Sequence, residues 1–494
     1  MAMSENRTRV TGKGAATVRR SAISEPTEAV DSSEAARPLQ LAQRLMQSMD
    51  EGEYPPGSRL PSIRASIRLS GFSQGTVVEA YRILLDLGRI RSVPGGGYYV
   101  SEASSVPRPA PSRILQRISL DPALDRALSL ENQNVRAPFG LALPSEDLLP
   151  LASLKRCINE ALRKPGGTGY SFPPGSMELR QEIAARYRQT GVSLHGDEVI
   201  LTGGATQAAY IVLKEITRAG DLVALESPCY SGFLYQARGF DLKYLEVPVQ
   251  SDAGLDLDVL EAQLKKGRRP RVLITVPNFQ NPTGALLSEE RRRGLIHLAH
   301  KYNFYIIEDD VYGGIHHGAR RFPPLASLDR DRVFLISSFS KTIAPASRLG
   351  WVVAPSGFQE KLLSRLRITT LGNSKMLEEA IAIFLRRGFY ERHLRKLRRE
   401  SRIRVGEIRR RLALSIPEAR ISSPEGGFLL WVELPEHVDG LEMQRRALEK
   451  GITLSPGSLY SPSGRYKNYI RLNCAVPMTD AILSCAEQIG TFMP

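Results

Sequence analysis

The chain has 494 residues, of which 42% are hydrophobic and 24% are charged. This hydrophobic fraction is too high for a disordered chain, and the length allows about three folded units. No run of about 18 uncharged apolar residues could span a membrane, and the first residues lack the apolar segment of a secretory signal. We therefore expect a cytoplasmic, multi-domain protein without a membrane partner.

The cysteines and histidines give no metal-binding pattern. The four cysteines lie far apart and form no CxxC pair, which argues against a disulfide scaffold or a zinc ribbon. His316 and His317 lack the partner spacing of metal ligands, and we expect both to be solvated. The sequence predicts no metal site.

The formal net charge of +15 invites a nucleic-acid function, but its distribution matters more than the total. Residues 37–102 hold eight Arg against six acidic residues. Residues 386–411 hold twelve Arg and Lys against three Glu. Because the excess lies mostly in the C-terminal half, composition alone does not locate a DNA-binding module.

Residues 1–36 lack apolar periodicity, and we expect them to form a disordered tail. Residues 37–102 then predict three helices and a hairpin. Ser62 begins the second helix, Gly88 ends the third, and 89–100 form the hairpin around Pro-Gly-Gly-Gly. The apolar stripes of the three helices are Leu39, Leu41, Leu45, Met46 and Met49; Ile63 and Ile67; and Val77, Tyr81, Leu84 and Leu85. This order predicts a winged helix-turn-helix domain.

The segment PPGSRLPSIRASIRLSGFSQGTVVEAYRILLDLGRIRSVPGGGYYV resembles the DNA-binding domain of the GntR family of bacterial transcription factors. The resemblance implies that the third helix enters the major groove of double-stranded DNA. It places Ser73, Gln74 and Thr76 at the start of that helix, where base edges are read, and Gly96 in the wing. Arg59, Ser62 and Arg64 would contact phosphates.

The domain departs from the GntR pattern at several positions. Gln74 stands where Arg is usual, and Ser66 and Ser70 stand where Leu is usual. These changes are compatible with a weaker core between the helices or with altered base reading. A winged helix that only contacts protein is the alternative to DNA binding.

Residues 103–135 contain several prolines and little periodicity, which predicts a tether. Residues 136–494 alternate helical stretches with short apolar runs: EVILTGG, DLVALESP, RVLITVP, FYIIEDD and RVFLISS. This alternation predicts an α/β domain with a mainly parallel sheet and a ligand site at the carboxyl ends of its strands.

The polar residues that follow these strands favour one cofactor. A lysine among hydroxyls, a strand-end aspartate, an Asn-Pro turn and a helix N-terminus fit pyridoxal phosphate. This cofactor needs an amine for a Schiff base, a carboxylate for its ring nitrogen, donors for its phenolic oxygen and a cradle for its phosphate.

Residues 140–480 resemble the fold-type I aminotransferases. The resemblance implies that Lys341 forms the Schiff base and that Asp309 pairs with the ring nitrogen. Arg471 would grip the α-carboxylate of an amino compound. The other implied cofactor contacts are Asn281 and Tyr312 at the ring oxygen, Tyr230 stacked on the ring, Ala205, Thr206, Ser338, Ser340 and Arg348 at the phosphate, and Tyr170 reaching the phosphate of a partner subunit.

Residues 386–411 predict a long amphipathic helix with its arginines outward and an apolar stripe. The stripe would consist of Phe389, Leu394, Leu397, Ile403, Ile408 and Leu412. The basic face is either a solvated surface or a second contact with the DNA backbone.

A GntR-type domain joined to an aminotransferase-like domain resembles the MocR subfamily of regulators. The resemblance implies a head-to-tail homodimer that senses pyridoxal phosphate, or an amino compound through aldimine formation, and so changes DNA binding. One alternative is an active aminotransferase with an accessory DNA-binding domain, since no expected catalytic residue is missing. Another is a DNA-binding protein in which the cofactor only stabilises the dimer.

Overall fold

The protein is described from a computed structural model, which divides into two compact units between Arg108 and Pro109. The predicted tail 1–36 lies outside the described residues, and so does most of the predicted tether 103–135. The structure describes residues 37–50, 52–86, 89–93, 96–101, 114–115, 135–251 and 253–493. No helix in these ranges is long and apolar enough to cross a membrane.

The N-terminal unit has the predicted winged helix-turn-helix order. Its elements are α1 (Arg37–Asp50), α2 (Ile63–Ser70), α3 (Gln74–Asp86), and the antiparallel strands β1 (Ile90–Val93) and β2 (Gly97–Val100). Tyr81, Leu84 and Val77 of α3 are buried against α1, as their spacing predicted. Leu39 is 49% exposed and is not part of this core, and Gly88 lies outside the described residues.

The unusual serines of α2 are accommodated by hydrogen bonds. Ser66 is buried, and its hydroxyl lies 2.7 Å from the hydroxyl of Tyr81. Tyr81 in turn donates to the carbonyl of Pro61, and Ser70 donates to the carbonyl of Ser66. Because a buried hydroxyl costs little once it is paired, this polar contact replaces the apolar contact that leucine would make.

The C-terminal unit is built on a large sheet in the order β3-β8-β7-β10-β11-β12-β13-β6, with β9 paired to β8. All five predicted strands are present. Strands β6, β7, β8, β10, β11 and β12 run in one direction, while β13 is antiparallel to both of its neighbours. The bounds are β3 Ile114–Leu115, β6 Val199–Thr202, β7 Leu222–Ser227, β8 Lys243–Gln250, β9 Gly254–Leu255, β10 Val272–Thr275, β11 Tyr305–Asp309, β12 Val333–Ser338 and β13 Gly350–Val353.

Strand β3 comes from the segment predicted to be a tether. Its two residues pair antiparallel with Tyr244 and Leu245 of β8. Part of the segment between the two units therefore belongs to the large sheet.

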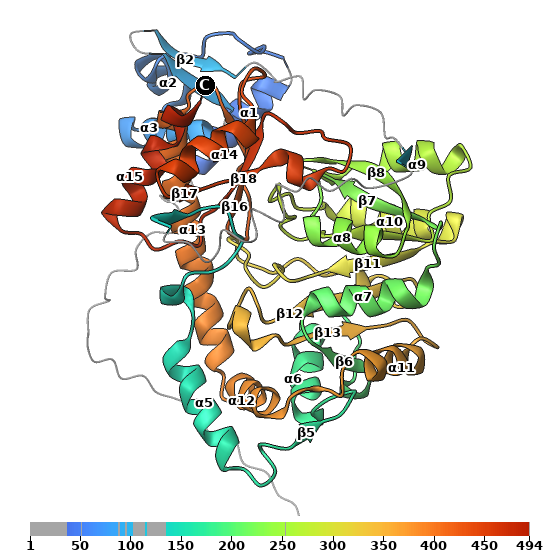
Figure 1. Cartoon of the computed structure of the whole chain (residues 1–494). Helices are drawn as coiled ribbons and strands as arrows, with labels where there is room; N and C mark the ends of the chain where they lie inside the picture. The colour runs from blue at the N-terminus through green and yellow to red at the C-terminus, as the bar shows by residue number, and fades with distance from the viewer. Residues whose placement is uncertain are drawn as a thin grey trace, which may run out of the picture. The chain divides into compact units, whose positions relative to one another are not determined.

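Helices cover the sheet, and the long α13 runs along one side of the unit (Figure 1). The helices of the large sheet region are α5 Leu151–Arg163, α6 Met177–Arg188, α7 Ala205–Ile216, α8 Ser231–Gly239, α9 Leu257–Lys265, α10 Glu289–Tyr302, α11 Gln359–Thr369, α12 Lys375–Arg386 and α13 Phe389–Ser415. The strands are buried on both faces, which explains why they appear in the sequence as continuous apolar runs.

A smaller sheet, in the order β15-β16-β19-β18, completes the C-terminal unit. Its strands are β15 Arg420–Ile421, β16 Leu429–Glu433, β18 Ser455–Pro456 and β19 Tyr469–Asn473, and the helices nearby in the chain are α14 Gly440–Glu449 and α15 Asp480–Gln488. Two short pairs, β4 (Ala137–Pro138) with β17 (Ile452–Thr453) and β5 (Tyr170–Ser171) with β14 (Asn373–Ser374), join distant segments.

Helix α13 confirms the predicted long amphipathic helix, but two of its residues face differently from the prediction. Ile403 is 54% exposed and does not belong to the apolar stripe. Arg404 is buried, where it pairs with Asp147 and donates to the carbonyl of Val476. A buried arginine therefore stands where the periodicity predicted an outward one.

Candidate cofactor and DNA-binding sites

The carboxyl ends of the parallel strands open into a cavity of about 430 Å³. Side chains that follow β10, β11 and β12 meet there with the first turn of α7. All but one of the predicted cofactor and effector residues line it: Ala205, Thr206, Tyr230, Asn281, Asp309, Tyr312, Ser338, Ser340, Lys341, Arg348 and Arg471. Such a cavity has the size of a small-molecule site.

One end of the cavity is a cradle of donors around the N-terminus of α7. Gly204 caps this helix with φ +96°, so the amides of Ala205 and Thr206 begin the helix. Arg348 donates to the carbonyl of Gly203 at 3.2 Å and to the hydroxyl of Ser340 at 3.4 Å. A Cβ on Gly204 would lie 2.7 Å from Nη2 of Arg348, so only glycine leaves room for this guanidinium. Free amides at a helix N-terminus and a guanidinium favour an anion.

Asp309 is the last residue of β11 and lines the cavity. It is 6% exposed, and its carboxylate accepts a hydrogen bond from the backbone N–H of Val311 at 3.1 Å. Burial raises the pKa of Asp309 to about 7, because the charged form loses its hydration. A cationic partner in the cavity would restore the ionised form.

Lys341 follows β12 and lines the same cavity. Its Nζ donates to the carbonyl of Ala142 at 2.7 Å. Burial, with a further contribution from the nearby Arg471, lowers the pKa of Lys341 to about 8. An amine with this pKa is partly unprotonated near neutral pH, as a nucleophile toward an aldehyde must be.

Tyr312 and Asn281 are both buried and both line the cavity. The ring of Tyr312 contacts Phe428, with centroids 5.5 Å apart, and its buried hydroxyl has no hydrogen-bond partner in the described part of the chain. Burial raises the pKa of Tyr312, so the hydroxyl remains a donor. An unpaired buried hydroxyl is costly, and an acceptor bound in the cavity would satisfy it.

Arg471, on β19 of the smaller sheet, enters the same cavity. It is 4% exposed, donates to Asn281 at 3.2 Å and to the carbonyl of Gly140, and lies over the ring of Tyr460. No carboxylate of the described residues pairs with it. A buried arginine without a carboxylate partner is a natural site for an anionic group of a ligand.

These donors fit pyridoxal phosphate. The cradle at α7 suits a phosphate, Asp309 a ring nitrogen, the unpaired hydroxyl of Tyr312 a phenolic oxygen, and Lys341 an aldehyde carbon. When bound, this cofactor supplies an electron sink for an amino group attached to it. Glycine at position 232 leaves room for the ring of Tyr230, since a Cβ there would lie 2.4 Å from Cε1.

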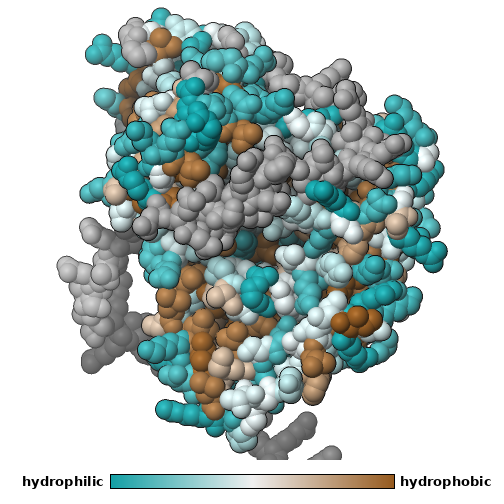
Figure 2. Space-filling view, viewed as in Figure 1, coloured by the Kyte–Doolittle hydropathy of each residue, from teal (hydrophilic) through white to brown (hydrophobic). Residues whose placement is uncertain are grey.

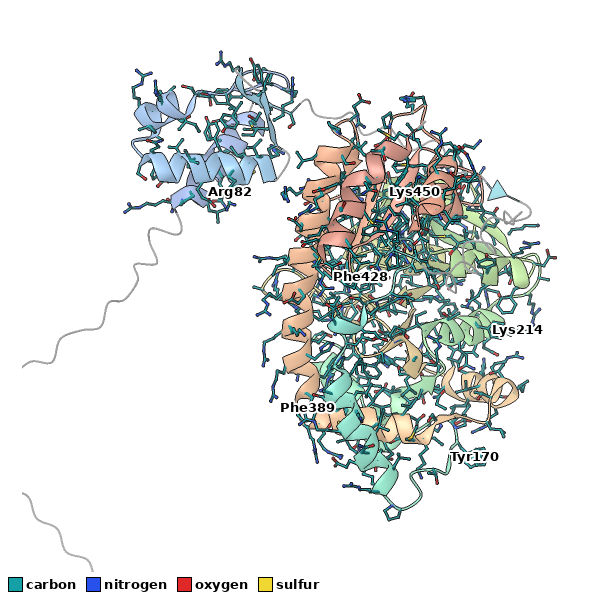
Figure 3. The ribbon with its side chains drawn as sticks, turned by 60° about the vertical axis from the view of Figure 1, so that its left-hand side comes forward. Arg82, Tyr170, Lys214, Phe389, Phe428 and Lys450 are labelled. Atoms are coloured by element: carbon teal, nitrogen blue, oxygen red, sulfur yellow. The ribbon has the colours of Figure 1, made fainter. Side chains whose placement is uncertain are left out.

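Tyr170 does not join the other candidates. It lies on β5, is 73% exposed and does not line the cavity. Figure 3 shows it at the edge of the unit, away from Phe428, which contacts Tyr312 inside. Within one chain, Tyr170 is therefore not a cofactor contact.

The structure also adds residues that the sequence did not indicate. Val135, Pro138 and the segment 140–143 line the cavity, and the carbonyls of Gly140 and Ala142 accept from Arg471 and Lys341. These residues belong to no motif, and the contacts of Gly140 and Ala142 are made by backbone carbonyls, which no local sequence pattern marks. The prediction that His316 and His317 are solvated was wrong. His316 is 5% exposed, His317 is half-buried and bonds to the carbonyl of Gly427 at 3.0 Å, and burial lowers the pKa of both. No group of three or more metal-binding side chains occurs in the described ranges.

The predicted DNA contacts lie on the N-terminal unit. Ser62 caps α2 by accepting from the amide of Ala65, and Ser73 accepts from the amide of Thr76 and lies 2.9 Å from its hydroxyl. Gln74 is the first residue of α3 and is exposed. Arg59 is exposed, and its backbone pairs with that of Tyr99 in the wing through an isolated β-bridge. Arg64 is exposed on α2. The backbone N–H of Gly96 donates to the carbonyl of Val93 and closes the wing turn.

Comparison with known families agrees with this division. Residues 38–100 match the family "Bacterial regulatory proteins, gntR family", and residues 141–489 match "Aminotransferase class I and II". The fold and the cavity thus define a protein of the aminotransferase class I and II family that carries a GntR-type DNA-binding domain. The cofactor of this fold is pyridoxal phosphate.

Relatives place the chain more narrowly, among HTH-type transcriptional regulators that contain both domains. It is 33% identical to the uncharacterized HTH-type transcriptional regulator YjiR and 34% identical to YdcR, both of Escherichia coli K12, over 91% of this chain and 97% of each relative. The structure is similar to that of LysN, an alpha-aminoadipate aminotransferase of Thermus thermophilus, with a TM-score of 0.70, 29% identity and coverage of 76% of this chain and 95% of LysN. The chain belongs to the transcriptional regulators, in an arrangement consistent with MocR-type GntR proteins.

Proposed function

We propose that this regulator binds its operator through the N-terminal unit and adjusts that binding according to what occupies the cavity of the C-terminal unit. The observation that carries the proposal is the presence, in one chain, of a GntR-type domain and a cavity with donors for both a cofactor and a carboxylate. A ligand acts only if it binds two conformations of the protein with different affinity. The cytoplasm is the compartment in which such a regulator meets DNA.

Each cavity residue has a role in this proposal. Lys341 holds the cofactor covalently, Asp309 faces its ring nitrogen, and Tyr230 stacks on its ring. The hydroxyl of Tyr312 and the amide of Asn281 hold its phenolic oxygen. The amides of Ala205 and Thr206, with Ser338, Ser340 and Arg348, hold its phosphate. Arg471 holds the carboxylate of an amino compound, the effector.

We also propose that the protein works as a head-to-tail homodimer. Tyr170 and Phe172 are 73% and 63% exposed, and Ile368 and Leu371 are 76% and 63% exposed. Pairing of β5 with β14 brings these two segments together, and we name the four residues the β5–β14 patch. Several neighbouring exposed hydrophobic side chains are typical of an interaction surface. Figure 2 shows further hydrophobic side chains over the part of the unit where α5 and α12 lie. In such a dimer Tyr170 would reach the partner's phosphate cradle.

On DNA, we propose that α3 lies in the major groove with Gln74 and Thr76 at base edges, supported by Ser73. Arg59, Ser62 and Arg64 would contact phosphates, and Gly96 would bring the wing backbone close to the duplex. The observation that supports these roles is where the side chains lie. Arg59 and Arg64 are exposed, and the hydroxyls of Ser62 and Ser73 are held in place by the helix caps that they form.

The test is a DNA-binding titration on the segment upstream of the protein's own gene, at fixed salt, with and without pyridoxal phosphate. A scrambled duplex of equal length is the control. We expect selective binding whose affinity changes when the cofactor is added. Equal, weak binding to both duplexes together with turnover of amino acids would favour the alternative, an aminotransferase with an accessory domain, because all the side chains expected for that chemistry are in the cavity.

A further inference from the structure

A second cavity, of about 310 Å³, lies in the C-terminal unit outside the cofactor site. It is enclosed by α6, by the segment that follows β11, by the end of β12 and by the first half of α13. Val311 and Ser338 line both cavities. The side chains around the second cavity are mostly polar, and several of them are charged.

The acidic side chains that line this cavity are already neutralised. Asp310 pairs with Arg321 and accepts hydrogen bonds from the hydroxyl of Tyr187 at 3.1 Å and from Asn278 at 2.9 Å. Glu391 lies 3.4 Å from the guanidinium of Arg186. Each of these carboxylates therefore has an arginine partner, and Arg186 is shared with Glu182, which lies closer to it at 2.9 Å.

One lining arginine remains without a carboxylate. Arg398 of α13 donates through Nε to the carbonyl of Gly314 at 2.8 Å, and it forms no ion pair with any described residue. Burial lowers the pKa of Arg398, which reflects the cost of holding this charge away from water. Its two terminal nitrogens are left with hydrogen-bonding capacity toward the cavity.

One neighbour of Arg398 has an unused donor as well. The buried Nε of Arg321 lacks a hydrogen-bond partner in the described part of the chain. His316 is 5% exposed and offers no donor here, because its Nδ1 donates to the carbonyl of Gly318 at 2.7 Å and burial lowers its pKa, which leaves Nε2 as an acceptor. An unpaired buried donor beside an arginine without a carboxylate partner is the feature expected of an anion site.

We propose that the second cavity binds a small anion through a carboxylate or phosphate group, with Arg398 as its counter-charge and Arg321 as a further contact. A volume of about 310 Å³ has room for a molecule larger than its carboxylate or phosphate group. Since Ser338 and Val311 also line the cofactor cavity, and Asp310 follows Asp309 directly, an anion bound here is linked to the occupant of the first cavity. By reciprocity, either ligand changes the affinity of the other by the same factor.

The test is isothermal titration of inorganic phosphate, and separately of acetate, into the full-length protein loaded with pyridoxal phosphate, at constant ionic strength. Loading fills the phosphate cradle of the first cavity, so that it does not compete. Arg398→Gln removes the unpaired charge. Arg399→Gln is the matched control, since Arg399 lies on the same helix, is 70% exposed and pairs with Glu400. Arg471→Gln reports on anion binding in the first cavity.

We expect saturable binding of at least one of the two anions, weakened about tenfold or more by Arg398→Gln and unchanged by Arg399→Gln. Arg471→Gln should remove only the acetate binding that belongs to the first cavity and leave the Arg398-dependent binding in place. Ala319→Trp, at an exposed position of the lining, should block entry without disturbing the core. The proposal is overturned if neither anion binds, if Arg398→Gln and Arg399→Gln have the same effect, if only Arg471→Gln weakens binding, or if Ala319→Trp leaves it unchanged.

Discussion

Two titrating side chains dominate the cofactor cavity, and burial moves their pKa values toward one another. The pKa of Asp309 is raised to about 7 and that of Lys341 is lowered to about 8. Without a bound partner each ionised group is held away from water at a cost. A cationic ring nitrogen beside Asp309 and a covalent bond at Lys341 would relieve both costs. The burial that makes the cofactor-free protein less stable therefore also favours binding of the cofactor.

Asp309→Asn should remove a pH dependence from the stability of the cofactor-free protein. The ordinary pKa of Asp is 3.8 and the folded value is about 7, so the folded state binds the extra proton between these values. Wild-type stability therefore falls as the pH rises through this window. We expect the variant to be more stable than the wild type at pH 8, on the order of 2–4 kcal/mol, with the difference vanishing near pH 4. Urea midpoints of the C-terminal unit measure this; a constant difference at all pH values would contradict it.

Lys341→Ala should abolish covalent attachment of pyridoxal phosphate while leaving the protein folded. We expect loss of the visible absorbance of the attached cofactor and no fixation of cofactor by borohydride. Lys214→Ala, which changes an exposed lysine of α7, is the control and should behave as the wild type. Borohydride fixation that persists in Lys341→Ala would assign the attachment to another lysine.

At the scale of elements, helices α3 and α13 present two different kinds of polar surface. Helix α3 begins with a cap in which Ser73 and Thr76 bond to one another, so its first turn is rigid where base contacts are proposed. Helix α13 has a dense row of arginines, but ion pairs engage many of them: Arg399 with Glu400, Arg404 with Asp147, Arg410 with Glu407, and Arg411 with Glu407 and Glu487. Of these partners only Asp147 and Glu487 lie outside residues 386–411, so the ion pairs offset only part of the excess charge counted in the sequence.

Thr76→Ala should weaken binding to the operator by about 1–3 kcal/mol, the cost of one lost base contact, and leave cofactor loading intact. Because Thr76 also bonds to Ser73, thermal unfolding of the variant must be compared with the wild type. A stable variant that binds operator and scrambled DNA as the wild type does would exclude Thr76 from base reading.

Replacing Arg395, Arg402 and Arg409 of α13 with Gln should change the slope of log K against log salt by less than about 0.9, the amount expected for one phosphate contact. The control replaces Arg218, Arg238 and Arg293, which are exposed outside α13 and carry the same total charge. A decrease of about 2–3 in the α13 variant alone would instead make this helix a second DNA-backbone surface.

The sequence predicted elements well where the pattern is local. Apolar runs marked the five strands, and the residues after them marked the cavity, because parallel strands end at one edge of a sheet. Contacts between distant segments were out of reach. The carbonyls of Gly140 and Ala142 at Arg471 and Lys341, the burial of His316 and the second cavity depend on how segments far apart in the chain pack, and no local periodicity records that.

At the scale of the whole molecule, the β5–β14 patch has an internal support. Glu378 is fully buried beneath it and accepts hydrogen bonds from Ser171, from the amide of Ser176 and from Asn373. A buried carboxylate thus holds together the two strands in or beside which these exposed hydrophobic residues lie. Holding hydrophobic side chains in place in solvent does not stabilise a single chain. An interface between two copies of the chain, by contrast, requires such side chains in a fixed position.

Ile368→Glu combined with Leu371→Glu should weaken self-association by at least tenfold, because a charge in an apolar interface loses its hydration. Sedimentation equilibrium of the full chain measures this. Leu414→Glu, which changes a residue that is 70% exposed on α13, is the control. A monomeric wild-type protein, or a dimer insensitive to both changes, would contradict the proposed interface.

Substitution of Gly204 should reduce the affinity for the cofactor in steps rather than abolish cofactor binding. A methyl group at this position would meet Arg348 and would have to adopt φ +96°, yet no charge, hydroxyl or lysine would be lost. A series from Gly through Ala to Ser should therefore lower cofactor affinity in steps while the N-terminal unit is untouched. Plotting operator affinity against cofactor occupancy across that series would show whether the protein acts as a switch with two settings or as a continuous gauge.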